Sequence, residues 1–234
     1  MKILKRLTSP LFLLLLALSV FTVGCGSVNE ETVPGITTTN VDGSTSVDED
    51  VFSAVLDTLP LDTLSTAESD GLLFMREEEK LARDVYIYLF AEWGAKVFDN
   101  ISESEQTHTD AILVLLDRYN LDDPVGDNTE GVFEDDYLQG LYDALILQGS
   151  SSLVNALYVG AEIEEIDLID IQTQVDALEG NEDIAIVYEN LMKGSRNHLR
   201  AFVKNLANQG VDYAPQHLSQ EEYDAIINED FETD

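Results

Sequence analysis

The stretch "SESEQTHTDAILVLLDRY" covers residues 102–119 and holds a Glu-x-x-His pair, Glu105 and His108, at the start of a helical apolar pattern. The apolar residues at 112–116 continue the face of this pair, because residues three or four apart share one side of a helix. Two interpretations of Glu105 are open. It is an inward metal ligand beside His108, or it closes a capping box with Ser102, since Ser-x-x-Glu is the capping pattern.

The same periodicity extends over most of the chain and predicts an all-α protein. Long helices are expected at about 67–94, 102–120, 151–175 and 181–208, and a shorter one at about 134–148. Ser219 and Glu222 have capping-box spacing and predict a last short helix. No segment alternates like a strand. The economical architecture is a four-helix bundle with additional short helices.

Each long helix carries an acid or an imidazole on the face that should be apolar. These candidates are Glu79, Glu105, His108, Glu164, Asp167 and His198. Buried carboxylates that face one another repel strongly unless cations compensate them. About four carboxylates with two imidazoles can hold divalent metal ions in a bundle core. Next to Glu79, Glu77 and Glu78 are expected to be solvated.

The first two sets of candidates resemble ferritin-like di-iron proteins, rubrerythrins in particular. The first helix of those proteins has Glu, then Ala at +3 and Tyr at +7, which Glu79, Ala82 and Tyr86 match. Their second helix carries Glu-x-x-His, matched by Glu105 and His108. The resemblance implies that these residues are metal ligands and that the metal is iron.

The resemblance continues in the third and fourth helices, with one departure. Glu164 and Asp167 match the acids of the third helix, and His198 matches the histidine of a second Glu-x-x-His. The glutamate of that motif is replaced by Ser195, so a di-iron and a mononuclear site both stay open. The cysteine pairs that rubrerythrins use for a second iron centre are missing, since the chain has one cysteine.

Four longer segments resemble a prokaryotic ferritin-like family catalogued as a domain of unknown function. They are "EEEKLARDVY", "SEQTHTDAILVLLDRYNLDDP", "GAEIEEIDLID" and "GSRNHLRAF", and the resemblance spans residues 68–206. It implies the ferritin-like fold and no established reaction.

The N-terminus predicts export. Residues 1–24 have a basic start and a short apolar run, as in a signal peptide. The following "FTVGCGS" resembles the lipobox of bacterial lipoproteins, which implies lipidation of Cys25, although Thr22 stands where that family usually has leucine. Residues 25–50 are rich in Ser, Thr and acids and predict a flexible tether. Residues 51–234 are then the bundle domain.

The formal net charge is −34, from 46 acidic and 12 basic residues. Such a surface repels nucleic acid and attracts cations. We therefore expect a cell-envelope lipoprotein, anchored to a membrane, that binds one or two iron ions or another divalent metal. An oxidase or peroxidase acting on oxygen or peroxide is one expectation. A non-catalytic metal-binding or interaction module is the alternative, and the oligomeric state is not predicted.

Overall fold

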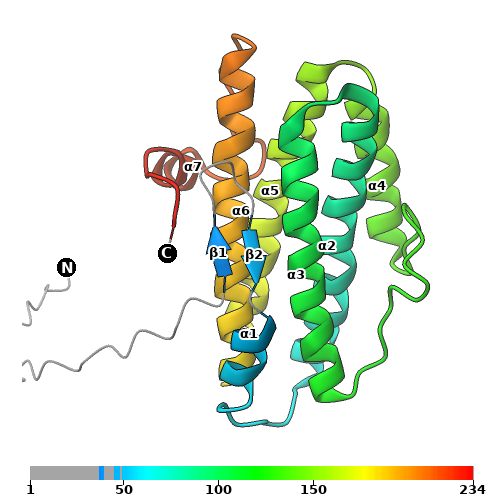
Figure 1. Cartoon of the computed structure of the whole chain (residues 1–234), viewed down its shortest axis with the longest axis vertical. Helices are drawn as coiled ribbons and strands as arrows, with labels where there is room; N and C mark the ends of the chain where they lie inside the picture. The colour runs from blue at the N-terminus through cyan, green and yellow to red at the C-terminus, as the bar shows by residue number, and fades with distance from the viewer. Residues whose placement is uncertain (1–36, 40–44, 48, 234) are drawn as a thin grey trace, which may run out of the picture. The chain divides into compact units, whose positions relative to one another are not determined.

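The computed structural model describes residues 37–39, 45–47 and 49–233, and helices make up nearly all of their regular secondary structure (Figure 1). The four long helices are α2 (Thr66–Trp93), α3 (Lys96–Tyr119), α5 (Leu153–Asp176) and α6 (Glu182–Asn208). The shorter ones are α1 (Glu49–Leu56), α4 (Asp136–Gly149) and α7 (Gln220–Ile227). The all-α class is therefore confirmed.

A short antiparallel hairpin of β1 (Thr37–Thr39) and β2 (Thr45–Val47) precedes α1, with Thr37 paired to Val47. It lies within residues 25–50, where the sequence predicted only a tether. Its strands are rich in β-branched residues, which suit a pleated ladder. The predicted signal peptide and Cys25 lie outside the described residues.

The long helices form two antiparallel pairs. α2 packs against α3, α5 packs against α6, and the pairs meet through α2 with α5 and α3 with α6. The loop after α3 and helix α4 return the chain to the end at which α3 began, so α3 and α5 run in the same direction (Figure 1). α4 also packs on α2 and α5. As a result α2 has packed neighbours on more than one side.

Local signals set the ends of the helices. Ser65 and Glu68 form a capping box at the start of α2, and Gly94 ends it with φ at +64°. α3 then begins at Lys96, earlier than the sequence predicted. Ser102 is consequently inside α3, and its hydroxyl donates to the Asp99 carbonyl at 2.9 Å. The capping-box interpretation of Glu105 is therefore wrong.

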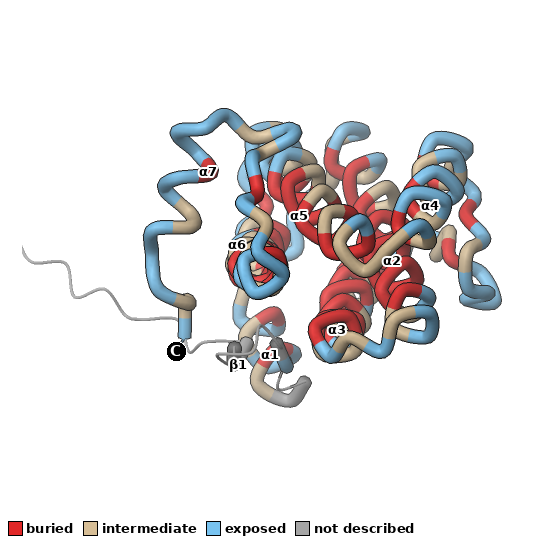
Figure 2. Tube along the Cα trace, turned by 90° about the horizontal axis from the view of Figure 1, so that it is seen from above, coloured by how far each residue is buried: buried red, intermediate tan, exposed pale blue. Residues whose placement is uncertain are grey.

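The interior consists of two apolar clusters with a polar layer between them. Along α2, the buried apolar residues at 72 and 75 belong to one cluster and those at 81, 82, 85, 86 and 89 belong to the other, while residues 76–80 are all buried and polar. α6 repeats this pattern, with apolar residues at 184–191 and 199–206 on either side of a polar section. Buried residues line the facing sides of the long helices (Figure 2). The layer therefore crosses the whole bundle.

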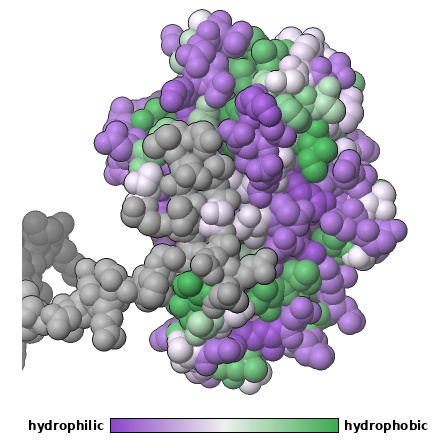
Figure 3. Space-filling model, in the orientation of Figure 1, coloured by the Kyte–Doolittle hydropathy of each residue, from purple (hydrophilic) through white to green (hydrophobic). Residues whose placement is uncertain are grey.

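The face drawn in Figure 3 is largely hydrophilic, with scattered apolar residues. Within the described part of the chain, no helix is long and apolar enough to cross a membrane.

Candidate metal centre

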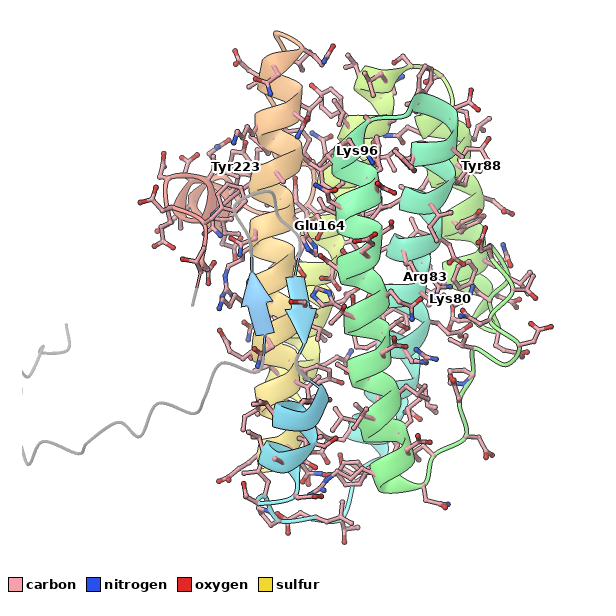
Figure 4. The ribbon with its side chains drawn as sticks, in the orientation of Figure 1. Lys80, Arg83, Tyr88, Lys96, Glu164 and Tyr223 are labelled. Atoms are coloured by element: carbon pink, nitrogen blue, oxygen red, sulfur yellow. The ribbon has the colours of Figure 1, made fainter. Side chains whose placement is uncertain are left out.

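The polar layer gathers the predicted ligands from all four long helices. α2 supplies Glu79, α3 supplies Glu105 and His108, α5 supplies Glu164 and Asp167, and α6 supplies His198. Each is at most 6% exposed. The helical spacing is the cause, since each ligand lies three or four residues from buried apolar neighbours on its own helix. Figure 4 shows Glu164 in the interior, between the helices.

Glu105 lies at the centre of this group. One of its oxygens is 2.9 Å from Nδ1 of His108, and the other is 2.8 Å from Nδ1 of His198. The two imidazole rings stack with their centroids 5.4 Å apart. One ligand atom from each of the three residues lies within 4.8 Å of the others, so the cluster could hold a metal ion.

Two further carboxylates flank the histidines almost symmetrically. Oε2 of Glu79 is 3.2 Å from Nδ1 of His108, and Oε2 of Glu164 is 3.3 Å from Nδ1 of His198. The Nδ1 atom of each histidine therefore faces Glu105 and one further carboxylate. The arrangement consists of two half-sites that share Glu105.

Asp167 lies in the same layer but beside the cluster. The Ser195 hydroxyl, at the position where a second Glu-x-x-His would have its glutamate, donates to Oδ2 of Asp167. Oδ1 of Asp167 is buried and has no hydrogen-bond partner. Asp167 has no ion pair with either histidine among the described contacts. The structure therefore links five of the predicted ligands through a continuous series of contacts and leaves the sixth next to them.

Tyr86 fixes the orientation of Glu164. Its hydroxyl donates to Oε1 of Glu164 at 2.5 Å and lies 3.3 Å from the carbonyl of Gly160. Tyr86 is fully buried, and burial together with the Glu164 charge raises the pKa of its hydroxyl well above the usual value. The phenol therefore stays protonated and holds one carboxylate oxygen while the other faces His198.

His108 is held by a close approach of α6. A methyl group added at Gly194 would lie 2.5 Å from both Cε1 and Nε2 of the ring. Only glycine leaves room at this point, so the backbone of α6 forms one wall of the site. A rigid wall keeps the imidazole in a single position.

Burial disfavours the charged form of each carboxyl and imidazole group in the centre. The pKa values show which of these groups are charged nevertheless. Burial raises the pKa of Glu79 to about 7, against the effect of the His108 ring. Burial also disfavours ionised Glu105, but the His198 and His108 rings hold its pKa well below the usual range. The Glu105 and Glu164 carboxylates overcome burial at His198 and raise its pKa to about 9.

Without metal, the centre therefore balances its carboxylates with protons on the imidazoles. A metal cation can replace those protons, because ligand nitrogens must be deprotonated to bind. Several buried ligand atoms also have no hydrogen-bond partner, which is rare in folded proteins. They are Oε1 of Glu79, Oδ1 of Asp167, and Nε2 of His108 and His198. The donor set fits a metal ion.

The prediction that Glu77 and Glu78 are solvated is wrong, since each is 4% exposed. Glu77 accepts from the backbone N–H groups of Glu134 at 2.6 Å and Asp135 at 3.1 Å, just before α4. Glu78 has no hydrogen-bond partner for either oxygen. The apolar pattern of α2 identifies its face toward the centre. The same pattern does not indicate that a second face of α2, which α4 and the preceding loop cover, is buried.

Comparisons with known proteins find relatives over most of the described chain. Residues 68–230 match the family described as an uncharacterized protein domain, DUF2202. The uncharacterized protein MJ0754 of Methanocaldococcus jannaschii is 51% identical over 173 residues, which are 74% of this chain and 93% of that protein. The crystal structure of hypothetical protein MJ0754 from Methanococcus jannaschii matches with a TM-score of 0.73, covering 74% of this chain and 99% of that one. The chain with this buried Glu-His-His cluster therefore belongs to DUF2202, a family of unknown function.

Proposed function

We propose that this chain is a ferritin-like metal protein that binds one or two transition-metal ions, iron first, in its polar layer. The observation that carries the proposal is the position of Glu105, whose two oxygens face Nδ1 of His108 and Nδ1 of His198. Glu79 and Glu164 complete a half-site on each side. Imidazole nitrogens with carboxylates are donors that suit iron, manganese and zinc.

The path of the chain supports the ferritin-like assignment. Ferritin-like bundles have one long crossover between two helix pairs, as α4 and its preceding loop provide here. Their di-metal sites use a Glu from each of two helices and Glu-x-x-His from each of the other two. Glu79 and Glu164 match the two single glutamates, Glu105 with His108 matches one Glu-x-x-His, and His198 matches the histidine of the other.

Ser195 bears on whether one ion or two would bind. Because a serine stands where a second Glu-x-x-His would have its glutamate, α6 offers no carboxylate at that position, and the serine hydroxyl donates to Asp167 instead. The cluster of Glu105, His108 and His198 is by itself the two-histidine, one-carboxylate set of non-haem iron sites. A bound redox-active metal would supply electrons for a reaction with oxygen or peroxide. The same residues serve a non-catalytic metal-binding protein if that reaction does not turn over.

Metal content tests the proposal directly. The purified protein is loaded anaerobically with ferrous iron, desalted and analysed for metal. We expect one or two ions per chain in the wild type and almost none in His198→Ala, because His198 is fully buried against two carboxylates. The matched control is His217→Ala, since His217 is exposed and only 3.3 Å from Glu162 on the outer surface. A wild type without metal, or a His198→Ala variant that keeps it, contradicts the proposal.

The location in the cell envelope is proposed from residues 1–25 alone. A lipid anchor on Cys25 would keep the bundle at a membrane although its described helices do not span one. Cell fractionation should recover the wild type with membranes and release Cys25→Ala into the soluble fraction. A variant that stays with the membranes would show that the cysteine is not the anchor.

A further inference from the structure

Glu78 is a buried carboxylate that the centre described above does not use. It is 4% exposed, and neither of its oxygens has a hydrogen-bond partner. Burial, together with the nearby acids Asp167, Asp170 and Glu79, raises its pKa well above the usual value. A buried carboxyl without a hydrogen-bond donor therefore keeps a proton unless a cation binds beside it.

Its neighbour Glu77 shows that this isolation is specific to Glu78. Glu77 is equally buried, but two backbone N–H groups before α4 satisfy its oxygens. The anchoring of the α4 segment therefore explains Glu77. No N–H or O–H group of the described residues donates to Glu78, whose carboxyl lies within hydrogen-bonding reach of the Asp170 carboxyl.

A small cavity lies beside Glu78, between α2, α4 and α5. Its volume is about 10 Å³, which is room for one water molecule or one small ion. Two carboxylates line it, Glu78 and Asp167, and the rest of the wall is apolar: Leu81, Ala82, Leu141, Ile163 and Ile166. An apolar wall leaves the two carboxylates as the only charged groups that a cation in the cavity would meet.

The cavity lies between the surface and the centre. Asp167 belongs to the polar layer and keeps one oxygen without a partner. On the outer side, Asp170 follows one turn later on α5 and is partly exposed. Asp170, Glu78 and Asp167 thus form an acidic series from solvent inward.

We propose that Glu78, Asp167 and Asp170 form a transfer site for divalent metal cations, through which an ion passes from the surface at α4 and α5 to the buried centre. The inference rests on the proposed function, because it needs a centre that takes up metal. The net charge of −34 attracts cations to the protein. The transfer site gives such a cation a route from the surface at α4 and α5 to the buried centre.

The kinetics of Co²⁺ loading test this proposal. The full chain is mixed with Co²⁺ in a stopped-flow instrument, and the visible absorbance of bound Co²⁺ is followed. Glu78→Gln and Asp170→Asn should each slow loading by about tenfold or more, within the range by which focused charge raises association rates. The final number of Co²⁺ ions per chain should not change. Glu92→Gln is the control, since it removes the same charge from an exposed position on α2.

Each outcome separates this inference from the proposed function. Wild-type loading rates in either Glu78→Gln or Asp170→Asn overturn the transfer site and leave the centre intact. A lower final Co²⁺ content in Glu78→Gln would make Glu78 a ligand of the centre and also overturn transfer. If the wild type shows no Co²⁺ signal that depends on His198, the proposed function itself fails. Because Asp170 is at the surface, its variant tests the idea even if Glu78→Gln folds poorly.

Discussion

Replacing Glu105 with alanine is expected to abolish metal binding at the buried centre. Glu105 contacts Nδ1 of both histidines, at 2.9 Å and 2.8 Å, so its loss removes a ligand from each half-site at once. Residues that merely orient ligands cost about 10–100-fold in affinity when they are changed. Loss of the shared ligand should cost at least about 100-fold, or about 2.7 kcal/mol. Competition with a coloured chelator measures it.

The matched control is Glu103→Ala, two residues earlier on α3, where the side chain is exposed. It changes the net charge equally and should leave the affinity unchanged. Glu105→Gln keeps the volume and removes the charge, so it should lie between the wild type and Glu105→Ala. Wild-type affinity in Glu105→Ala would mean that the metal binds elsewhere on this acidic protein.

The same substitution should alter how the stability of the metal-free protein depends on pH. The raised pKa of His198, about 9 against an ordinary 6.5, stabilises the fold fully below pH 6.5. That stabilisation is lost as the pH rises through about 9. In Glu105→Ala the pKa of His198 should fall, because its nearest carboxylate is gone. Urea unfolding between pH 6 and pH 9 should then show a shallower decline in the free energy of unfolding than in the wild type.

The sequence could identify these candidate ligands because the buried faces of their helices follow a simple period. Glu79 falls in step with Leu72 and Met75 on α2, and all three are buried. Glu105 and His108 fall in step with Ile112 in the same way. A polar residue at a position where the helical period predicts an apolar one can be recognised from the sequence alone. Its distance from a ligand on another helix cannot, since it depends on how the helices pack.

Residues buried by distant segments could not be predicted. Glu165 has no local pattern that marks it, yet it is fully buried. Its carboxylate accepts from the Tyr213 hydroxyl at 2.5 Å and from the backbone N–H groups of residues 216–218. These contacts join α5 to a segment about fifty residues later, at separations of 48 to 53 positions. Glu77 and Glu78 belong to the same class, because α4 and its loop cover them.

Asp84 is the residue whose loss should cost most in stability. It is 1% exposed and accepts from Lys80 at 2.5 Å, from Arg83 at 2.7 Å and from the backbone N–H of Gly131 at 2.9 Å. Lys80 and Arg83 lie on the side of α2 that faces the loop after α3 (Figure 4). Lys80 donates to the carbonyl of Thr129, so the same group also fastens this loop.

Asp84→Ala should therefore lower the free energy of unfolding by about 3–5 kcal/mol, because it leaves two buried cations without their carboxylate. The control is Asp99→Ala, which breaks an ion pair with Lys96, a side chain that is 76% exposed. Exposed pairs contribute about 0–1 kcal/mol. Urea unfolding compares the two variants, and Lys80→Met combined with Asp84→Ala should recover part of the loss. If Asp84→Ala costs no more than the control, water must reach Lys80 and Arg83.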